Sequence, residues 1–331
     1  MGANKKVIKM QKMGLVPYLR RSWSLYFMLM LPMAFFIVFR YVPMTNVVMA
    51  FKNYNMFQGV WSTGNPVCPY PETGVHMAAC GHWVGFEWFQ RAFASRDFWF
   101  ALRNTLWLNL LDLVVGFPAP IILALILNEL IFRTFKKFTQ TVIYLPHFLS
   151  WIIVSSMASR LFAPTTGVVN LFLVQNFGVG PIDFLMDKAN WVGTYVMFGV
   201  WKEMGWGTII YLAAITGINP ELYEAAEVDG AGRWRKLWHI TLPGIRPTII
   251  VLLIMNIGRI LGIEFDRPYT MMNTMVMEVA DVLSTLVYRL GIRSFQFSLT
   301  TAIGLFQSVV CVIFLVSANA LAKRFGERGI W

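Results

Sequence analysis

Runs of about twenty residues with few or no charges recur along this chain, and they constrain its fold more than any other feature. A helix of that length crosses the hydrocarbon core of a bilayer. It also satisfies its backbone hydrogen bonds internally, as lipid requires. The sequence therefore predicts an all-α, polytopic membrane protein whose transmembrane domain covers 23–325. Six transmembrane helices are expected at about 23–48, 104–130, 141–161, 191–216, 248–263 and 299–322.

Composition agrees with a membrane protein and argues against a nucleic-acid-binding one. Only 14% of the residues are charged, against about 25% in soluble domains. The 27 phenylalanines and 13 tryptophans suit lipid–water boundaries. The net charge of +11 comes from bases at the edges of apolar runs, with no continuous basic face. We therefore expect membrane lipid as a partner, and no nucleic acid.

The N-terminal segment 1–22 is basic and contains no acid, which predicts a cytoplasmic location by the positive-inside rule. It resembles the positive flank of a signal peptide. However, the apolar run that follows lacks a small-residue cleavage site and is long enough to span, so we expect a retained first helix. An even number of spans places the tail 326–331 on the same side. Both termini are thus expected in the cytoplasm, with the chain in the cell (inner) membrane.

Three of the connections between spans are expected outside the cytoplasm, at about 49–98, 164–190 and 264–298. Within the first, aromatic residues over 83–100 have partly helical spacing and indicate an interfacial helix on the membrane. Cys68 and Cys80 also lie in this loop. Outside the cytoplasm they are consistent with a disulfide or with two free thiols.

The segment 219–247 is rich in charge although it lies between two apolar runs, and its basic side chains predict a cytoplasmic loop. Asn219 suits an N-cap, Pro220 the first helical position, and Gly230 a helix C-terminus. A short helix over about Pro220–Asp229 follows. We expect a second short helix that ends at Leu242-Pro243, after which the chain re-enters the bilayer.

Within this loop, Glu224-Ala225-Ala226 is followed by three residues, Gly230, nine residues and Ile240-Thr241-Leu242-Pro243. The pattern resembles the EAA loop of permease subunits in binding-protein-dependent ABC importers. The resemblance extends to carbohydrate-type permeases, closest to those for oligosaccharides and polysaccharide fragments. It rests on the stretches FRYVPM (39–44), FPAPIILALILNE (117–129), YLPHFLSW (144–151), WKEMGWGTIIYLAA (201–214), HITLPGIRPTI (239–249) and KRFGERGIW (323–331).

The resemblance implies a type I importer permease fold in which the EAA loop is a coupling helix that docks on a cytoplasmic ATPase. It implies as partners a second permease subunit in a heterodimer, two ATP-binding subunits, an extracytoplasmic solute-binding protein and a sugar. No GxxxxGKS or GxxxxGKT sequence occurs, so ATP is hydrolysed by a separate chain and this subunit is not an enzyme. No cofactor is expected. The coupling residues implied are Glu224, Ala225, Ala226, Asp229, Gly230, Arg233 and Pro243, with Arg235 and Lys236 as charge partners.

Ionisable residues within spans are functional candidates, because a charge in lipid is costly. Six residues of the fourth and fifth spans are predicted to line a substrate path: Trp201, Lys202, Glu203, Trp206, Asn256 and Arg259. A carboxylate accepts hydrogen bonds from sugar hydroxyls, a tryptophan stacks on a pyranose face, and Lys202 or Arg259 suits an acidic sugar. Alternatively, Lys202 and Glu203 pair with each other or with the partner subunit.

Two other polar residues within spans are given structural roles. Asp112 is expected to hydrogen-bond within the bundle. His147 follows a proline and has no second ligand in register, which favours a histidine at a helix kink over a metal site, and no metal is expected.

Other function classes have less support. A non-sugar solute remains open, as does the choice between a neutral and an acidic sugar. A secondary transporter is favoured by internal repeats, and none is visible. An intramembrane transferase needs clustered catalytic residues, but no HExxH, GxSxG or paired carboxylates occur at the span boundaries.

Overall fold

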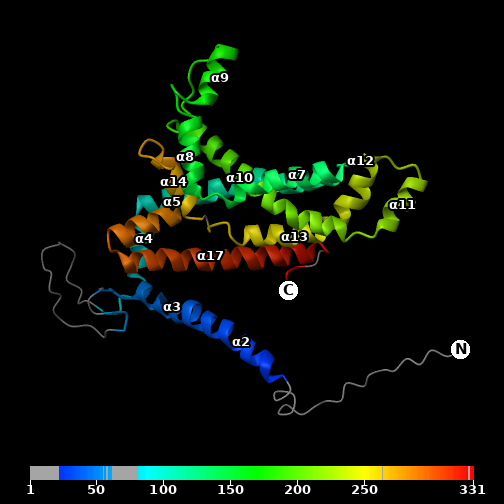
Figure 1. Ribbon diagram of the computed structural model, residues 1–331. Coiled ribbons are helices and arrows are strands. Elements are labelled where there is room, and N and C mark those ends of the chain that lie inside the picture. The colour runs from blue at the N-terminus through cyan, green and yellow to red at the C-terminus, as the bar shows by residue number, and fades with distance from the viewer. Residues whose placement is uncertain (1–21, 55, 57–58, 62–80, 263, 327–328) are drawn as a thin grey trace. The chain divides into compact units, whose positions relative to one another are not determined.

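A computed structural model of the protein describes residues 22–54, 56, 59–61, 81–262, 264–326 and 329–331. These residues are helical, apart from loops and one isolated antiparallel bridge between Lys52 and Trp83. The chain forms two units, Met1–Trp83 and Val84–Trp331 (Figure 1). The all-α class predicted from the sequence is confirmed.

The helical part of the first unit that the structure describes is one long segment. Its bounds are α2 Trp23–Phe36, the π-turn η1 Ile37–Tyr41, α3 Val42–Met44 and the 3-10 turn η2 Thr45–Phe51. Together they give 29 residues, or about 43 Å of helix, which is enough to cross a bilayer. The wider π-turn ends two residues before Pro43, whose ring has no N–H and crowds the preceding helical turn. No side chain of α2 is buried.

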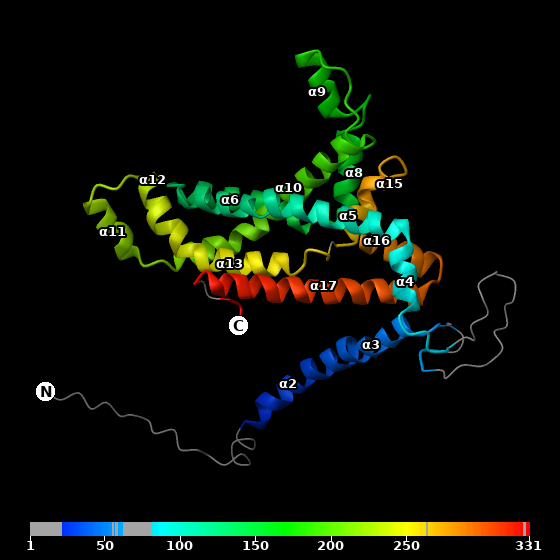
Figure 2. The ribbon, with the colours of Figure 1, turned by 180° about the vertical axis from the view of Figure 1, so that it is seen from behind.

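The second unit holds the other helices. Their bounds are α4 Glu87–Ala94, α5 Arg96–Leu111, η4 Asp112–Gly116, α6 Pro118–Asn128, α7 Arg133–Tyr144, η5 Leu145–Phe148, α8 Trp151–Leu161, α9 Val168–Phe177, α10 Lys188–Thr216, α11 Pro220–Val228, α12 Arg233–Lys236, η6 Leu237–Thr241, α13 Leu242–Ile257, α14 Asp266–Met271, α15 Met277–Ala280, α16 Leu283–Tyr288, η7 Arg289–Arg293 and α17 Phe297–Arg324. In this unit α10 packs along α6, and α13 packs on α17. Figures 1 and 2 show α11 and α12 at one end of the unit and α4 at the other.

In the described part of the chain, four helices are long and apolar enough to cross a membrane: Trp23–Phe51, Arg96–Asn128, Arg233–Ile257 and Phe297–Arg324. The helix α10 has a comparable length of 29 residues but carries charges. These five account for all the predicted spans except the third.

The third predicted span, 141–161, is sharply bent in the structure. The helices Thr134–Phe148 and Trp151–Leu161 meet at an angle of 100°. Pro146 lies in the last turn before the bend, and Leu149 is extended. Ser150 then caps α8 by accepting a hydrogen bond from the Ile153 amide at 3.4 Å. The bend thus has a local cause in a proline followed by a new N-cap.

The fifth predicted span, 248–263, is displaced. The helix begins at Arg233 and continues without interruption to Ile257, so the predicted stop at Leu242-Pro243 is wrong. The π-turn η6 widens the helix just before Pro243, which relieves the clash of the proline ring with the preceding turn. At the other end, the helix stops six residues earlier than predicted.

Two segments expected to be outer connections hold short helices. Residues 264–298 hold α14, α15 and α16, and Val276, Ala280, Val282, Leu283 and Leu286 are fully buried. Residues 164–190 contain the apolar helix α9. Helices this short give no hydropathy signal of a span, and their burial depends on contacts with distant segments.

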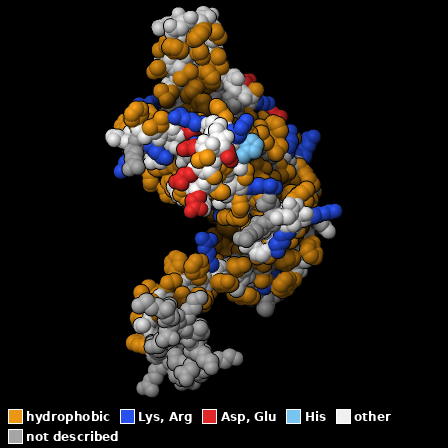
Figure 3. All heavy atoms as spheres, turned by 90° about the vertical axis from the view of Figure 1, so that its right-hand side faces the viewer, with side chains coloured by type: hydrophobic (Ala, Val, Ile, Leu, Met, Phe, Trp, Pro, Cys, Tyr) orange, Lys and Arg blue, Asp and Glu red, His pale blue; other side chains and the backbone are white. Residues whose placement is uncertain are grey.

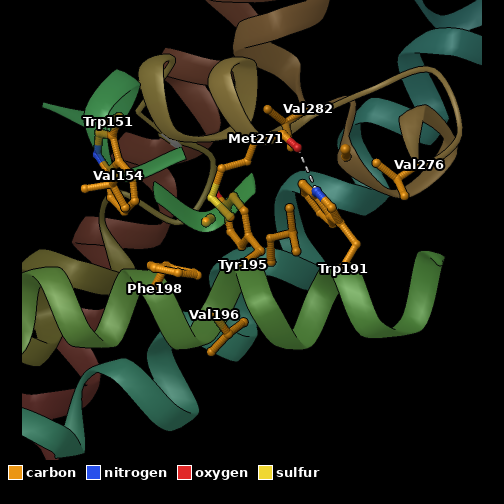
Figure 4. Close-up of a cluster of buried hydrophobic side chains, with 12 residues drawn as sticks. Trp151, Val154, Trp191, Tyr195, Val196, Phe198, Met271, Val276 and Val282 are labelled. Atoms are coloured by element: carbon orange, nitrogen blue, oxygen red, sulfur yellow. Dashed lines mark hydrogen bonds between the residues drawn. The ribbon is translucent and has the colours of Figure 1, made fainter. Parts of the chain in front are cut away.

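The main buried cluster joins α5, α8, α10 and the segment that follows α14 (Figure 4). Trp191 and Tyr195 stack at 5.0 Å between ring centroids. The Trp191 indole donates to the Met271 carbonyl at 2.9 Å, so this buried polar atom is satisfied. The cluster fixes α14 against α10, and this positions the break described below.

Candidate functional site

The helix α13 ends at Ile257 and α14 begins at Asp266, so regular helical hydrogen bonding is interrupted between them; this interruption is called the break below. Side chains of two other helices donate hydrogen bonds to backbone carbonyls of the break. Asn109 donates to the Ile260 carbonyl at 2.7 Å, and Gln307 donates to the Leu261 carbonyl at 2.6 Å. Irregular backbone at membrane depth occurs only where protein buries it or where it lines a water-filled space.

A cavity of about 480 Å³ lies beside this break. It lies between η4 and α6 on one side, α10 on another, and α13 with the break and α14 on the third. The residues that line it are Asp112, Gly116, Phe117, Pro120, Gly199, Val200, Glu203, Met204, Trp206, Gly207, Ile210, Tyr211, Leu252, Asn256, Arg259 and Arg267. Its volume falls within the range of about 300–1,000 Å³ of ligand pockets.

The structure places four of the six predicted path residues on this one cavity: Glu203, Trp206, Asn256 and Arg259. Trp201 and Lys202 lie elsewhere. Trp201 packs into the buried cluster, with its ring edge against Phe198. Helical geometry explains why Glu203 and Trp206 line the cavity while Trp201 and Lys202 do not, because neighbours in sequence point about 100° apart on α10.

Lys202 is buried and fully engaged. Its ammonium donates to Glu203 at 2.9 Å and to the His147 carbonyl at 3.1 Å, and it lies 5.1 Å from the centre of the Trp151 ring. The alternative that Lys202 pairs with Glu203 is therefore what the structure shows. Lys202 ties α10 to the bend between η5 and α8.

His147 lies at that bend, as its position after a proline indicates, but it also contacts the cavity wall. Its Nδ1 lies 2.8 Å from a Glu203 oxygen, and its ring stacks on Trp206 at 4.6 Å with 5° between the planes. One face of the Trp206 indole is thereby covered. In the described residues no three potential metal ligands cluster.

Arg267 is a cavity residue that the sequence prediction missed, because it lies in a segment expected to be an outer loop. Its guanidinium forms a two-pronged pair with Asp112, at 2.7 and 3.2 Å, and donates to the Tyr195 carbonyl at 2.7 Å. A Cβ on Gly199 would overlap the guanidinium, so this glycine leaves room for it. The predicted hydrogen bonding of Asp112 within the bundle is confirmed.

The charge-rich loop forms α11 within one residue of the predicted bounds. Asn219 caps it by accepting from the Glu221 amide at 3.1 Å. At its other end Gly230 has a φ of +73°, and the amides of Gly230 and Ala231 donate to the Glu227 and Ala226 carbonyls. This is a Schellman motif, in which a left-handed glycine satisfies the last carbonyls of a helix. The predicted N-cap and C-terminal glycine are confirmed.

No residue of α11 is buried. Val228 is 89% exposed and Leu222 is 52% exposed. Two contacts hold the helix: the Tyr223 hydroxyl lies 3.0 Å from the Thr241 hydroxyl, and Lys236 donates to Glu227 at 2.5 Å. The second contact lowers the pKa of Glu227. Figure 3 looks onto this end of the unit, where acidic side chains gather with basic ones around them.

Of the predicted coupling residues, Glu224, Ala225 and Ala226 lie on α11 itself, and the others follow it in the chain. Glu224, Ala225 and Asp229 are exposed, and Ala226 is partly covered. Arg233 starts α12 and borders an apolar groove of about 720 Å³ between α6 and α12, to which Trp234 also contributes. Pro243 lies inside a continuous helix.

The predicted cysteine pair, Cys68 and Cys80, lies outside the described residues. Cys311, on α17, is a free thiol and is partly buried.

The fold and the site define a multi-pass helical membrane protein with a cavity between its helices and an exposed helical loop at one end. The chain matches the model of the family described as binding-protein-dependent transport system inner membrane component over residues 116–327. It belongs to this family, so the resemblance seen in the EAA loop is confirmed.

Individual relatives cover nearly the whole chain. It is 45% identical to protein LplB of Bacillus subtilis (strain 168), over 95% of this chain and 92% of that protein. It is 44% identical to the polygalacturonan/rhamnogalacturonan transport system permease protein YteP of the same organism, over 93% and 90%. A chain of a bacterial alginate ABC transporter, crystallised with an alginate pentasaccharide-bound periplasmic protein, superposes with a TM-score of 0.82 at 38% identity, over 96% and 99%.

Proposed function

We propose that this chain forms half of the translocation path of an ATP-driven importer for an oligosaccharide, in the cell membrane with both termini in the cytoplasm. Relatives named for polygalacturonan/rhamnogalacturonan and alginate transport support a fragment of a polysaccharide as the solute. A second permease subunit supplies the other half of the path, two separate ATP-binding subunits supply the energy, and an extracytoplasmic binding protein delivers the sugar.

The observation that carries this proposal is the place of α11 in the chain. The helix α10 contributes Glu203 and Trp206 to the cavity and ends at Thr216, directly before α11. After α11, the continuous helix Arg233–Ile257 leads back to the cavity and contributes Asn256. A displacement of α11 therefore acts on two cavity walls at once through rigid helices.

The surface of α11 suits contact with another protein. Its side chains are exposed, and they include the apolar Val228 and Leu222. Ala225 presents no bulk, which allows close approach. Since the loop is closed by its own caps and by the Glu227–Lys236 pair, it offers a preformed helix to the ATPase.

In the cavity, three of the predicted path residues have distinct roles toward a sugar. Trp206 offers its uncovered ring face to a pyranose, and Glu203 and Asn256 accept hydrogen bonds from hydroxyl groups. The Asn256 amide nitrogen already donates to the Leu252 carbonyl at 2.8 Å, which leaves its oxygen as the acceptor.

The coupling role is tested by Ala225→Trp, which adds bulk to the exposed face of α11 without disturbing its caps. We expect the variant to reach the membrane at normal levels, to lose co-purification of the ATP-binding subunits and to lose oligosaccharide uptake. The matched control is Ala320→Trp, at an exposed position of α17. We expect it to retain both the association with the ATP-binding subunits and oligosaccharide uptake. Normal association of the ATPase with the Ala225→Trp variant would show that α11 is not the docking site.

A further inference from the structure

Charge on the cavity wall is unevenly compensated within this chain. Among its lining residues, Asp112, Glu203, Arg259 and Arg267 are charged. Asp112 and Arg267 neutralise each other across 2.7 Å, and Glu203 is neutralised by Lys202 behind it at 2.9 Å. Only Arg259 remains, so the wall carries one uncompensated positive charge.

Arg259 forms no hydrogen bond through its side chain and no ion pair with any residue that the structure describes, and it is exposed to the cavity. The acids nearest along the chain, Glu264 and Asp266, make no ion pair with it. All the other ionised groups facing the cavity have a partner at 2.7–2.9 Å. Among the charged residues on the cavity, the lack of an ion-pair partner within the described residues is therefore specific to Arg259.

The setting of Arg259 makes an unpaired charge informative. It follows the long apolar helix Arg233–Ile257 and lines a cavity between the helices of a membrane protein. Because a charge in contact with lipid is costly, the guanidinium requires water or an anion in the cavity.

We propose that Arg259 binds a carboxylate of the transported sugar, and that the solute is an acidic oligosaccharide built from uronate-type units. The inference rests on the proposed import function and specifies its substrate class. The planar guanidinium fork matches a carboxylate in a two-pronged geometry. Trp206 and Asn256, on the same cavity, supply a ring face and a hydroxyl acceptor beside it.

Lys202, the other cation considered for this role, is excluded by its surroundings. Its side chain is 8% exposed and its ammonium already contacts Glu203 and the His147 carbonyl. Arg267 is excluded in the same way, because Asp112 and the Tyr195 carbonyl occupy its fork. The competing explanation is that a carboxylate of the second permease subunit neutralises Arg259 in the assembled transporter.

The test uses the complete transporter in proteoliposomes, with ATP inside and binding protein outside. The substrates are galacturonate and mannuronate trisaccharides and their carboxyl-reduced, neutral counterparts. For Arg259→Gln we expect the KM for the acidic sugars to rise about tenfold or more, as the loss of a charge-assisted hydrogen bond implies. We expect Arg259→Lys to give a KM for the acidic sugars between those of the wild type and Arg259→Gln. Arg324→Gln, which removes an arginine from the last turn of α17 away from the cavity, is the matched control and leaves the KM unchanged.

Each other outcome has a defined meaning. If the wild-type transporter imports only neutral oligosaccharides, or if Arg259→Gln leaves acidic import unchanged, the inference is overturned and the proposed function stands. If Arg259→Gln weakens association with the second permease subunit and reduces all substrates equally, the guanidinium pairs with protein and the inference is again overturned. If no oligosaccharide is imported, the proposed function itself is wrong.

Discussion

The pair between Asp112 and Arg267 is the sharpest test of how the second unit is held together. It joins η4 to α14, segments 155 residues apart, with side chains 29% and 11% exposed. Asp112→Asn removes the charge but keeps the shape. Arg267 is then left charged and largely buried, and removal of one partner from a buried pair costs about 3–5 kcal/mol. The partial exposure of Asp112 favours the lower limit, about 3 kcal/mol.

The thermodynamic cycle with Arg267→Met separates the pair from its surroundings. Each single variant leaves one uncompensated charge, whereas the double variant leaves none. We therefore expect the double variant to be less destabilised than the sum of the two single variants, by about 1–3 kcal/mol.

The assay is the apparent melting temperature of the detergent-purified protein. At about 2 °C per kcal/mol for a chain of this size, Asp112→Asn lowers it by about 6 °C. Asp97→Asn is the matched control, because Asp97 is 57% exposed and lies 3.4 Å from Arg289. A surface pair of this kind contributes less than about 1 kcal/mol. Additive single-variant effects, or equal shifts for Asp112→Asn and the control, would refute the reasoning.

Three further predictions concern individual positions. Gly205→Ala would place a Cβ against a backbone carbonyl of α7, and we expect it to lower the melting temperature. Gly193→Ala, in open space on the same helix, is the control and is expected to raise the free energy of unfolding by about 0.5–1 kcal/mol. Equal effects of the two variants would contradict the packing of α10 on α7. Gly230→Ala forces a residue with a Cβ into a φ of +73°, at a cost of about 1–2 kcal/mol. We therefore expect faster hydrogen exchange in α11. Gly230→Asn is expected to have the smaller effect, because asparagine tolerates this φ better. Lys236 lowers the pKa of Glu227 below its ordinary value of 4.5. Their pair therefore stabilises the loop above pH 4.5 and is lost as the pH falls through the lowered pKa. We expect the hydrogen-exchange protection of α11 to decrease in acid, and Glu227→Gln to remove this pH dependence.

The sequence predicted the loop best, because the signals there are local. An N-cap at Asn219 and a left-handed glycine at Gly230 act within a few residues of the helix they terminate. The structure reproduces α11 from them within one residue. The prediction of a stop at Pro243 is wrong, because the helix Arg233–Ile257 continues through this proline, with the turn before it widened at η6.

The cavity was predicted only in part. Glu203, Trp206, Asn256 and Arg259 stood out as polar or aromatic residues in apolar runs, and they lie together on the cavity wall. Arg267 did not stand out, because its segment is too short to register as a span. Its position depends on a distant residue of η4.

What the sequence determined by itself is the class of protein, the approximate helices and the capped loop, because apolar length and cap chemistry are properties of contiguous residues. The tertiary structure decided where the third helix bends, how far the fifth extends and which charges are compensated. It distinguished Lys202, buried against Glu203, from Arg259, exposed on the cavity and without a partner in the described chain. Both are cations within predicted spans, and only the side chains brought near them by folding determine whether their charge is available to a ligand.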